Sequence, residues 1–512
     1  MQKANLLKRH VIYICTFLLL LTGLWASVGA YGQGKTRIHV LHADAYNFNA
    51  RLGKDVQRLI GHVKLKQDST LFFSDSAFLN DKKRNFDAFG RVHINVNDTL
   101  NLYGDRLHYN GKTRIAELFG HVVLQDEKAR LTTNHLVYNR LTRIAFYDAG
   151  GTIYSDSNIL KSKQAIYNTQ SNIFHFRKEV VLSNPDQVTR ADTLIYNTNN
   201  KTAYFRGPTL IKDSQSTIRC VKGWYDTRRD VSKLMNMPVI ESNGQQLTAD
   251  SLEYNNHTTF GRAFGRLRIT DTLHSVIVEG RVGEMWDNKG ITYVTDSAMA
   301  ITYYKGDSLF IHADTLWVYF DRNRKTKKML AYNGVRFYRD DLQGKCDSLS
   351  YVMSDSSLNL YKLPVLWSGK NQLTADSMQI SIGGNHIDSL NMYNNAFIIS
   401  RDSLTSFNQI SGRMMTGYFK QNKIYKMNVE GNAQSIYWVR DDDKRLIGVN
   451  KAEASSMVIR ISNNQIRAIN YLEQPSQKMF PETELTKENR YLKGFQWLEK
   501  LRPFSKLDIF SK

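Results

Sequence analysis

The sequence contains few residues that interrupt or cross-link a polypeptide fold. Only seven prolines and three cysteines occur in its 512 residues. Few prolines mean few enforced breaks, and no low-complexity segment separates one part of the chain from another. An apolar run extends from Val11 to Leu24, and no later run approaches the roughly 20 residues that a membrane-spanning helix needs. The sequence therefore excludes a protein with several transmembrane helices.

The N-terminal segment has the order of a secretory signal. Lys3, Lys8 and Arg9 precede the apolar run, and small residues follow at Val28-Gly29-Ala30. About 14 apolar residues are too few for a retained anchor. No small residues precede Cys15, as a lipoprotein anchor would require. We predict cleavage after Ala30 and an exported protein.

Acidic residues are scarce relative to basic ones. The chain has 69 Lys and Arg against 48 Asp and Glu, a net charge of +21, and removal of the three basic residues of the signal leaves +18. Polyanions are the natural partners of such a surface. Export and the absence of a recognisable nucleic-acid-binding motif argue against nucleic acid, whereas a phosphorylated or acidic glycolipid fits. The alternative is a solvated basic surface without a specific partner.

The motifs of common catalytic and metal sites are absent as well. The histidines are scattered, and neither His-Glu-x-x-His nor Gly-x-Ser-x-Gly occurs. Gly29 to Thr36 matches the phosphate-binding loop pattern, but it straddles the predicted cleavage site and leads into a strand-like segment instead of a helix. We predict no enzyme activity, no bound cofactor and no metal site.

What the sequence does contain is a repeat. Six tyrosines stand 29 residues apart, each followed by Asn or, once, Asp: Tyr109, Tyr138, Tyr167, Tyr196, Tyr225 and Tyr254. A fixed period of this length indicates one supersecondary unit copied along the chain. The predicted fold class is all-β, in the form of an elongated repeat array of stacked strands.

Each unit reads Ala-Asp-x-Leu-x-Tyr-Asn, then a polar turn, a second apolar run and Gly-x-Val-x-Leu. Leu107 and Tyr109 lie two residues apart, so they share one face of a strand while Arg106 and His108 point to the other. The asparagine suits a turn stabilised by its own side chain. The glycine, as at Gly120, predicts a further turn, so that each unit contains at least two strands.

Two further sets of residues in the repeat have side chains that can bind a metal ion or form a disulfide. One holds aspartates: Asp105, Asp192, Asp250, Asp314, Asp347 and Asp376. Because Lys163 occupies the same column and would repel a cation, these residues predict turn capping and not calcium binding. Cys220 and Cys346 lie about four units apart, nearly 20 Å at the spacing of strands, whereas a disulfide reaches only about 7 Å. We predict that both are unpaired.

The copies divide the chain into segments. We predict a signal peptide over residues 1–30 and a first β-repeat region over 31–270. Weaker copies at 313–316, 346–351 and 375–378 predict an irregular continuation or bend over 271–340 and a second repeat region over 341–474. Residues 475–512 form a C-terminal tail, in which 485–501 predicts a short helix. The tail is either a docking segment or a cap on the last strands of the repeat array.

The repeated Ala-Asp-x-Leu-x-Tyr with its following Gly-x-Val-x-Leu resembles the OstA-like (LptA-like) family of periplasmic lipopolysaccharide-transport proteins, most clearly over Asp75 to Ile269. Val429 to Ser435, followed by Lys451-Ala452-Glu453, is similar to the long OstA-like proteins of the Bacteroidetes group. The resemblance implies an open β-jelly roll of V-shaped, stacked strands whose apolar trough shields the acyl chains of lipopolysaccharide.

The resemblance also implies which residues contact lipid. They are the inward leucines and tyrosines of the repeat: Leu107, Tyr109, Leu136, Tyr138, Tyr167, Leu194, Tyr196, Leu252 and Tyr254. Ordinary core packing between two sheets is the alternative role, because periodicity does not distinguish a filled core from an open trough.

The implied location is the periplasm, with outer-membrane association as a further option. The implied partners are lipopolysaccharide, through its lipid A acyl chains, and inner- and outer-membrane transport proteins, which would pair with edge strands of the array. Head-to-tail self-association would use the same edges. Because the chain is much longer than the family's short bridge protein, it is either a bridge between the membranes or a periplasmic accessory to the outer-membrane component.

Two functions of other classes remain open. A right-handed β-helix that binds or cleaves acidic polysaccharide also repeats at about 20 to 30 residues, but it needs charged residues in register on one outer strand. A passive structural or adhesive stalk needs only an interior sealed by side chains.

Overall fold

The structure is a computed structural model that describes residues 37–48, 55–242, 244–304, 307–322, 325–383, 386–441, 443, 445–462 and 465–511. The predicted signal peptide and the segment from Gly29 to Thr36 lie outside the described residues. The chain divides into two compact units, residues 1–149 (unit 1) and 150–512 (unit 2).

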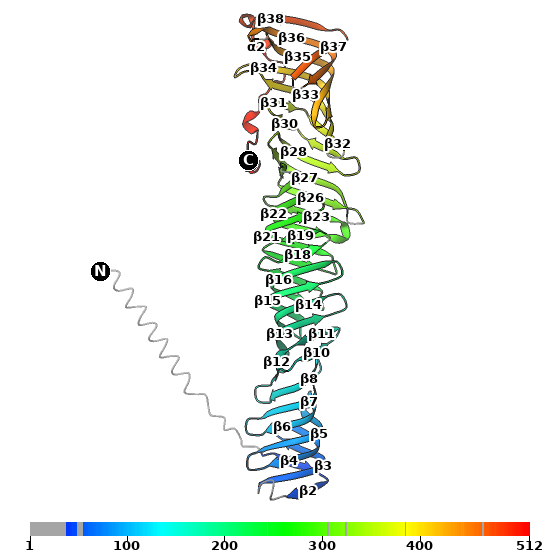
Figure 1. Cartoon of the computed structure of the whole chain (residues 1–512), viewed down its shortest axis with the longest axis vertical. Helices are drawn as coiled ribbons and strands as arrows, with labels where there is room; N and C mark the ends of the chain where they lie inside the picture. Colours follow the sequence, from blue (N-terminus) through cyan, green and yellow to red (C-terminus); the bar gives the residue numbers. More distant parts are fainter. Residues whose placement is uncertain are drawn as a thin grey trace, which may run out of the picture. The chain divides into compact units, whose positions relative to one another are not determined.

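Strands account for nearly all of the described secondary structure (Figure 1). Unit 1 contains β1 (His39–His42), β2 (Ala45–Phe48), β3 (Val56–Gln67), β4 (Thr70–Asn80), β5 (Asn85–Val96), β6 (Leu100–Asn110), β7 (Ile115–Gln125), β8 (Arg130–Asn139) and β9 (Ile144–Tyr147). The first part of unit 2 contains β10 (Gly151–Ser155), β11 (Asn158–Ser162), β12 (Gln164–Asn168), β13 (Ile173–Ser183), β14 (Val188–Asn197), β15 (Thr202–Lys212), β16 (Ser216–Asp226), β17 (Val231–Met235), β18 (Val239–Ser242), β19 (Gln245–Thr248), β20 (Ser251–Asn255), β21 (Phe260–Asp271), β22 (Val276–Trp286), β23 (Ile291–Thr295), β24 (Met299–Tyr304), β25 (Asp307–His312) and β26 (Thr315–Phe320).

The remainder of unit 2 continues the same way. It contains β27 (Thr326–Arg339), β28 (Leu342–Val352), β29 (Ser357–Tyr361), β30 (Val365–Ser368), β31 (Asn371–Thr374), β32 (Ser377–Gly383), β33 (His386–Arg401), β34 (Phe407–Lys420), β35 (Lys423–Arg440), β36 (Leu446–Ser462), β37 (Gln465–Leu472) and β38 (Ser476–Phe480). The helical elements are short: η2 (Asp287–Lys289), η3 (Glu482–Glu484), α2 (Lys487–Arg490), η4 (Glu499–Leu501) and η5 (Asp508–Phe510). The predicted all-β array of stacked strands is confirmed, and its longest described strands lie near the C-terminal end, where β35 has 18 residues and β36 has 17.

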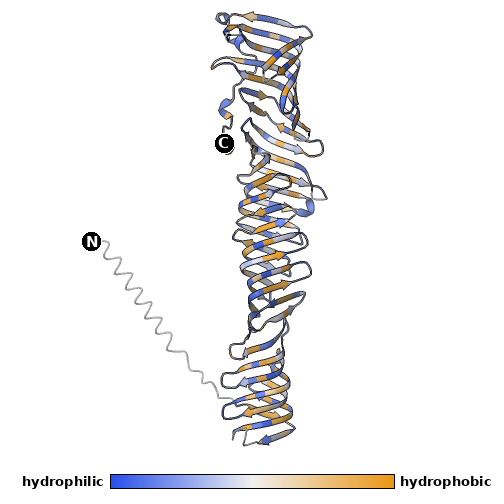
Figure 2. Cartoon of the chain, viewed as in Figure 1, coloured by the Kyte–Doolittle hydropathy of each residue, from blue (hydrophilic) through white to orange (hydrophobic). Residues whose placement is uncertain are grey.

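Consecutive long strands pair antiparallel within each unit. In unit 1, β3 to β9 form an uninterrupted antiparallel series, and β1 and β2 both pair with β3. Hydrophobic and hydrophilic residues alternate along these strands, as Figure 2 shows. The alternation places one set of side chains inside and the other in solvent.

The long strands of unit 1 from β3 to β8 bend at a β-bulge. In β7 the register with β8 shifts between Phe119 and Val122, at Gly120 and His121, which both have positive φ angles of 72° and 42°. The glycine therefore lies inside one continuous strand, and the prediction that it marks a turn between two strands is wrong. A left-handed glycine serves a bulge as readily as a turn. We call the half of each strand next to the Asn-containing hairpin turn the first arm, and the half beyond the bulge the second arm.

The aspartate column lies at these bends. A Cβ atom on Gly120 would lie 2.3 Å from Asp105 Oδ2, so the carboxylate occupies the space that a side chain would need. The same carboxylate bonds the ring of His121 at 2.7 Å. Asp75 plays the corresponding role at the preceding bend, where its Oδ1 accepts a hydrogen bond from Arg91 Nε at 2.8 Å. The aspartates hold the bend, while the hairpin turns are capped by other residues.

In unit 2 several bends interrupt the strand completely. Left-handed Asn236 and Met237 separate β17 from β18, yet both strands pair with β16. Each such pair of short strands thus forms the two arms of one bent strand. We call each bent strand, whether continuous or interrupted, a rung. The predicted irregular stretch 271–340 contains such separated arms, and its strands pair in the same antiparallel order.

The asparagine turns behave as predicted. Asn110 Oδ1 accepts hydrogen bonds from the backbone N–H groups of Lys112 at 3.0 Å and Thr113 at 3.2 Å. Successive turns also bond to one another, because Gly111 N–H donates to Arg84 C=O at 2.8 Å. The hairpin ends therefore stack directly along one edge of each unit.

The two arms face each other across the interior. In unit 1 the ring of Phe72, on the second arm of β4, lies 5.2 Å from Phe86 and 4.6 Å from Tyr109, both on first arms. The cross-section is a V whose arms touch through their inward side chains.

The C-terminal tail after β38 is mostly non-helical. Only Lys487–Arg490 forms an α-helical turn, so the helix predicted over 485–501 is wrong beyond that segment. The reason is that backbone groups of the tail bond to side chains of the sheet. Gln409 Oε1 accepts a hydrogen bond from Leu492 N–H at 2.9 Å, and its Nε2 donates to Arg490 C=O at 2.8 Å.

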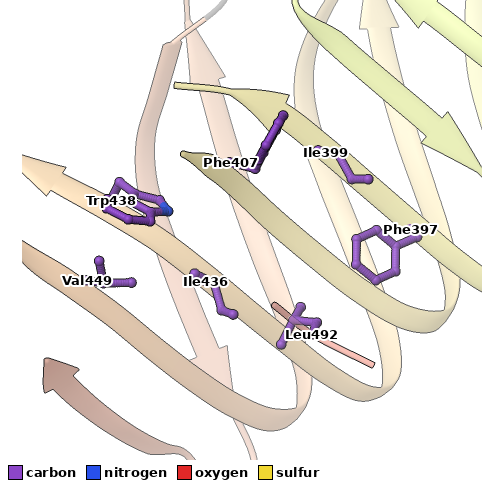
Figure 3. Close-up of a cluster of buried hydrophobic side chains, with 7 residues drawn as sticks. All are labelled: Phe397, Ile399, Phe407, Ile436, Trp438, Val449 and Leu492. Atoms are coloured by element: carbon purple, nitrogen blue, oxygen red, sulfur yellow. The ribbon is translucent and has the colours of Figure 1, made fainter. Parts of the chain in front are cut away.

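The tail covers the outer face of the second arms. Gln409 and Ile399 alternate along their strands with the inward Ile410 and Ile398, so they point away from the interior. The tail inserts Leu492 into an apolar cluster on this face (Figure 3). The strand residues of the cluster are Phe397, Ile399, Phe407, Ile436, Trp438 and Val449. The tail therefore does not cap the last rung but runs across several rungs from outside.

Candidate functional site

An apolar row runs along the first arms of unit 2 from strand to strand. Each member is the direct cross-strand neighbour of the next. The row consists of Ala165, Phe176, Leu194, Phe205, Gly223, Leu234, Leu252, Ala263, Gly283, Val294, Leu316, Ala331, Leu349, Leu360, Met378, Met392, Met415, Val429, Met457 and Tyr471. No member carries a charge, and the one polar atom is the hydroxyl of the terminal tyrosine. We call it the first-arm row.

The second arms of unit 2 carry a matching row on their inward face. Its members are again cross-strand neighbours. This second-arm row consists of Leu160, Leu182, Thr189, Ile211, Ile218, Ile240, Leu247, Ile269, Val278, Ala300, Ile311, Phe337, Gly344, Leu366, Leu373, Ile398, Ile410, Ser435 and Ala452. Only Thr189 and Ser435 are polar. The interior of unit 2 thus has a nearly continuous hydrocarbon lining on both sides.

Unit 1 repeats the arrangement at smaller scale. Its first-arm row is Leu59, Ala77, Ala88, Leu107, Leu118 and Leu136. Its second-arm row is Leu65, Phe72, Ile94, Leu102, Leu124 and Leu131. All twelve residues are buried.

The nine residues predicted to contact lipid all lie on first arms. Leu107 and Leu136 belong to the first-arm row of unit 1, and Leu194 and Leu252 to that of unit 2. The tyrosines form the next row towards the hairpin turns: Tyr109, Tyr138, Tyr167, Tyr196 and Tyr254. Eight of the nine are buried, and Tyr254 is half-buried.

The interior is filled by its own side chains where the aromatic residues cluster. Tyr167 and Phe174 stack with ring centroids 3.8 Å apart, and Phe176 continues the stack 5.4 Å beyond Phe174. A guest molecule in these rungs requires the arms to separate or the rings to rotate.

The lining is more accessible in one section of unit 2. Five consecutive members of the second-arm row, between β16 and β22, are half-buried instead of buried: Ile218, Ile240, Leu247, Ile269 and Val278. The half-buried Tyr254 lies on the first arm of β20, which pairs with β21 of the same section. We call this section the exposed section.

Side chains of different size face each other near the C-terminal end of unit 2. The first-arm row contributes Met378, Met392, Met415 and Met457, while the opposite arms contribute small residues such as Ala433 and Ala452. Methionine is flexible and polarisable, and it adapts to irregular partners. This section can therefore change its packing at low cost.

Polar side chains join the ends of the two arms where the hairpin turns lie. We call this opening between the arm ends the mouth of the V. In unit 1, Gln67 Nε2 donates to Gly111 C=O at 3.1 Å, and Arg140 Nη1 donates to Tyr109 Oη at 2.6 Å. Burial raises the pKa of Tyr109, and the neighbouring Arg140 opposes part of this rise. The hydroxyl of Tyr109 is thus held neutral inside the mouth.

Unit 2 has equivalent contacts. Asn158 Nδ2, at the start of β11, donates to Thr227 Oγ1 at 3.2 Å and to Tyr196 Oη at 3.4 Å. Asn184 Nδ2, in the turn after β13, donates to Tyr225 Oη at 3.4 Å, and burial raises the pKa of Tyr225. These contacts close the mouth over the rungs that carry them.

Sequence reasoning missed the second-arm row and the mouth contacts. The Gly-x-Val-x-Leu run carried the signal for the former, because its alternation places Val122 and Leu124 on the inward face. The mouth contacts had no comparable signal, since Gln67 and Arg140 lie 73 residues apart and belong to different units of the repeat.

The described residues form no group of three or more His, Cys, Asp or Glu side chains able to hold a metal ion. Cys220 and Cys346 are buried and unpaired, and burial raises their thiol pKa values to about 11 and about 12. Among the helices of the described chain, none combines the length and apolar character needed to cross a bilayer.

Part of the chain is similar to known proteins. Residues 35–192 match the family model described as OstA-like protein. A solved structure similar in part is LptH from Pseudomonas aeruginosa, described as the LptA homologous periplasmic component of the conserved lipopolysaccharide transport device. The two chains are 12% identical over 20% of this chain and 79% of LptH, with a TM-score of 0.19. The comparison with curated proteins gives no match. Over residues 35–192 the chain is therefore similar to the OstA-like family.

Proposed function

We propose that this chain binds lipopolysaccharide by holding its acyl chains between the two arms, and that it carries the lipid between the inner and outer membranes in the periplasm. The observation that carries the proposal is the pair of apolar rows that line unit 2. An acyl chain gains about 0.8 kcal/mol for each methylene removed from water. A lining that continues from rung to rung keeps this gain nearly constant along the path. Such a flat profile is what transport, as opposed to storage, requires.

The exposed section is the proposed entrance. There the second-arm row is half-buried, so an acyl chain can contact Leu247 and its neighbours without first breaking the contacts that close the mouth elsewhere. The acyl chain then enters neighbouring rungs by separating the inward side chains of the two arms. The OstA-like match over residues 35–192 supports the same class of guest.

The proposed partners bind at the ends of the array. A terminal strand has unpaired N–H and C=O groups along one edge, and another protein's edge strand can continue the sheet there. Inner- and outer-membrane transport proteins, or a second copy of this chain, are the proposed occupants. Export by a cleavable signal peptide is part of the same proposal.

Site-specific photo-crosslinking in growing cells tests the proposal. The crosslinker is placed at Leu247, in the exposed section, and at Gln246, its exposed neighbour on the same strand. We expect lipopolysaccharide adducts at Leu247 and none at Gln246. A second pair, Leu194 and Ile195, tests whether lipid reaches the closed rungs. Adducts at none of the inward positions would refute lipid binding and favour a passive stalk.

A further inference from the structure

The hairpin turns of unit 1 that end the first arms are strongly basic. The turns after β4, β6 and β8 contain seven basic residues and one acidic residue, Asp81. The basic residues are Lys82, Lys83, Arg84, Lys112, Arg114, Arg140 and Arg143. In unit 2, the corresponding turns after β12 and β14 contain a single basic residue, Lys201, which pairs with Asp156 at 2.8 Å. The turn after β16 adds Arg228 and Arg229 together with Asp230, so the densest basic charge among these turns lies in unit 1.

Backbone hydrogen bonds bring these turns side by side. Gly111 N–H donates to Arg84 C=O at 2.8 Å, and Arg140 N–H donates to Arg114 C=O at 3.1 Å. Arg84, Arg114 and Arg143 each have a left-handed backbone, with φ angles of 56°, 58° and 57°. Asparagine or glycine fits this conformation with less strain. These three arginines lie on neighbouring turns. Together with the other basic residues of these turns they form one edge of unit 1, which we call the basic rim.

The opposite rim is formed by the turns that end the second arms, and it is acidic. Its charged residues are Asp68, Asp98, Asp126, Glu127 and Lys128. Taken together, the two rims hold eight basic and five acidic residues. Acidic side chains of the protein thus neutralise the basic rim only in part.

A partly buried ion cluster joins the rims. Asp68 lies 3.3 Å from Arg114 and 3.6 Å from Arg140, so one carboxylate serves two guanidinium groups. The Arg140 side chain is only 7% exposed, and its Nε is buried without a hydrogen-bond partner among the described residues. A buried cation that is incompletely paired is costly, and an additional anion would relieve that cost.

The cluster adjoins the apolar interior. Arg140 donates to the hydroxyl of Tyr109, and the ring of that tyrosine packs 5.2 Å from Phe86 and 4.6 Å from Phe72. A molecule with an anionic group at the rim and hydrocarbon behind it matches both parts of the site.

We propose that the rim of unit 1 binds the phosphate group of an anionic amphiphile, which replaces the Asp68 carboxylate at Arg114 and Arg140 and so opens the mouth to the acyl chains. The proposal rests on the proposed lipid-binding function and adds the recognition of the head group. A phosphate monoester offers three acceptor oxygens to the two guanidinium groups, compared with two from Asp68.

Two substitutions with opposite effects test the proposal in the full mature chain. Asp68→Asn removes the internal competitor, and Arg114→Gln removes half of the cluster without touching the buried Arg140. With micelles of a bis-phosphorylated acylated disaccharide, we expect binding about tenfold tighter for Asp68→Asn and about tenfold weaker for Arg114→Gln. The control Arg228→Gln/Arg229→Gln removes two charges from the equivalent turn after β16 of unit 2 and is expected to leave binding unchanged.

The source of the phosphate is tested by two further ligands. The dephosphorylated amphiphile should bind all variants equally, and inorganic phosphate should compete only weakly. If inorganic phosphate competed as strongly as the phosphorylated amphiphile itself, the assignment to an amphiphile would be overturned. If the control variant lost as much binding as Arg114→Gln, the assignment to a specific site would be overturned. If the dephosphorylated amphiphile still crosslinks at Leu247 but the variants do not differ, the rim site fails while the proposed function stands.

Discussion

Gln409 and Leu492 are joined through the backbone of the C-terminal tail, 83 residues apart in the sequence. The glutamine accepts from Leu492 N–H and donates to Arg490 C=O, so it recognises the tail's main chain and not its side chains. Gln372 repeats the pattern with Leu498 N–H and Gln496 C=O, both at 2.7 Å. The tail is fixed at two points by the same chemistry.

Loss of these glutamines is expected to release the tail while the rest of the fold persists. In Gln372→Leu/Gln409→Leu, four backbone groups of the tail lose their partners, at a cost of about 1 to 3 kcal/mol each if they stay buried. Limited trypsin digestion should then cut at Lys487, Lys493 or Lys500 much faster than in the parent protein. Gln246→Leu, at an exposed glutamine, serves as the control. Equal cleavage in all three proteins would contradict this role of the glutamines.

The repeat made the inward face of the first arms predictable from sequence. A 29-residue period combined with two-residue alternation assigns Leu107 and Tyr109 to one face without any knowledge of tertiary contacts. The bend at Gly120 was not predictable, because a left-handed glycine fits a turn and a bulge equally well. The difference depends on Asp105, whose carboxylate fills the space beside the glycine only after the strands have paired.

The tail and the mouth contacts were beyond sequence reasoning for a different reason. The apolar residues from 485 to 498 fit a helix, but the glutamines that hold the segment extended lie on strands about 80 to 130 residues away. The cluster of Gln67, Tyr109 and Arg140 likewise joins three different rungs. Such contacts depend on which rungs meet at the mouth, and the period does not contain that information.

Tyr109→Phe is expected to destabilise unit 1 by about 1 to 3 kcal/mol, because its hydroxyl is a buried partner of both Gln67 and Arg140. Denaturant unfolding should measure this loss. Tyr103→Phe, at an exposed tyrosine, should change stability by less than about 0.5 kcal/mol. An equal effect of the two substitutions would show that the mouth contacts contribute little.

The same tyrosine makes stability depend on alkaline pH. Burial raises the pKa of Tyr109 above its unfolded value of about 10. The folded protein therefore holds the hydroxyl proton of Tyr109 more tightly than the unfolded chain does. The resulting contribution to folding stability is fully present below about pH 10, and it is lost as the pH rises through the raised pKa. Tyr109→Phe should flatten the fall in stability above pH 10, as followed by denaturant unfolding at several pH values. An unchanged slope would contradict the assignment.

The two cysteines should be unreactive in the native protein. With thiol pKa values raised to about 11 and about 12 by burial, Cys220 and Cys346 are almost entirely neutral at pH 8. Since the thiolate is the nucleophile, alkylation should be slow until the chain unfolds. Mass spectrometry after brief iodoacetamide treatment, with and without denaturant, measures this. Rapid labelling of the native chain at either cysteine would contradict the buried positions.

Linking the arms should block lipid entry if the guest separates them. Asn158 and Thr227 lie on opposite sides of the mouth in unit 2, and their side chains are 3.2 Å apart. In Asn158→Cys/Thr227→Cys, oxidation or a short bis-thiol reagent joins the two arms. The native cysteines, being buried and neutral, add little background reaction.

The linked protein should lose lipid adducts at Leu194, in the closed rungs, and keep those at Leu247, in the exposed section. Reduction of the link should restore adducts at Leu194, which separates the effect of linkage from that of the substitutions. Each single-cysteine variant, treated with the same reagent, provides the matched control. Undiminished adducts at Leu194 in the linked protein would mean that lipid reaches these rungs without separating the arms at Asn158 and Thr227.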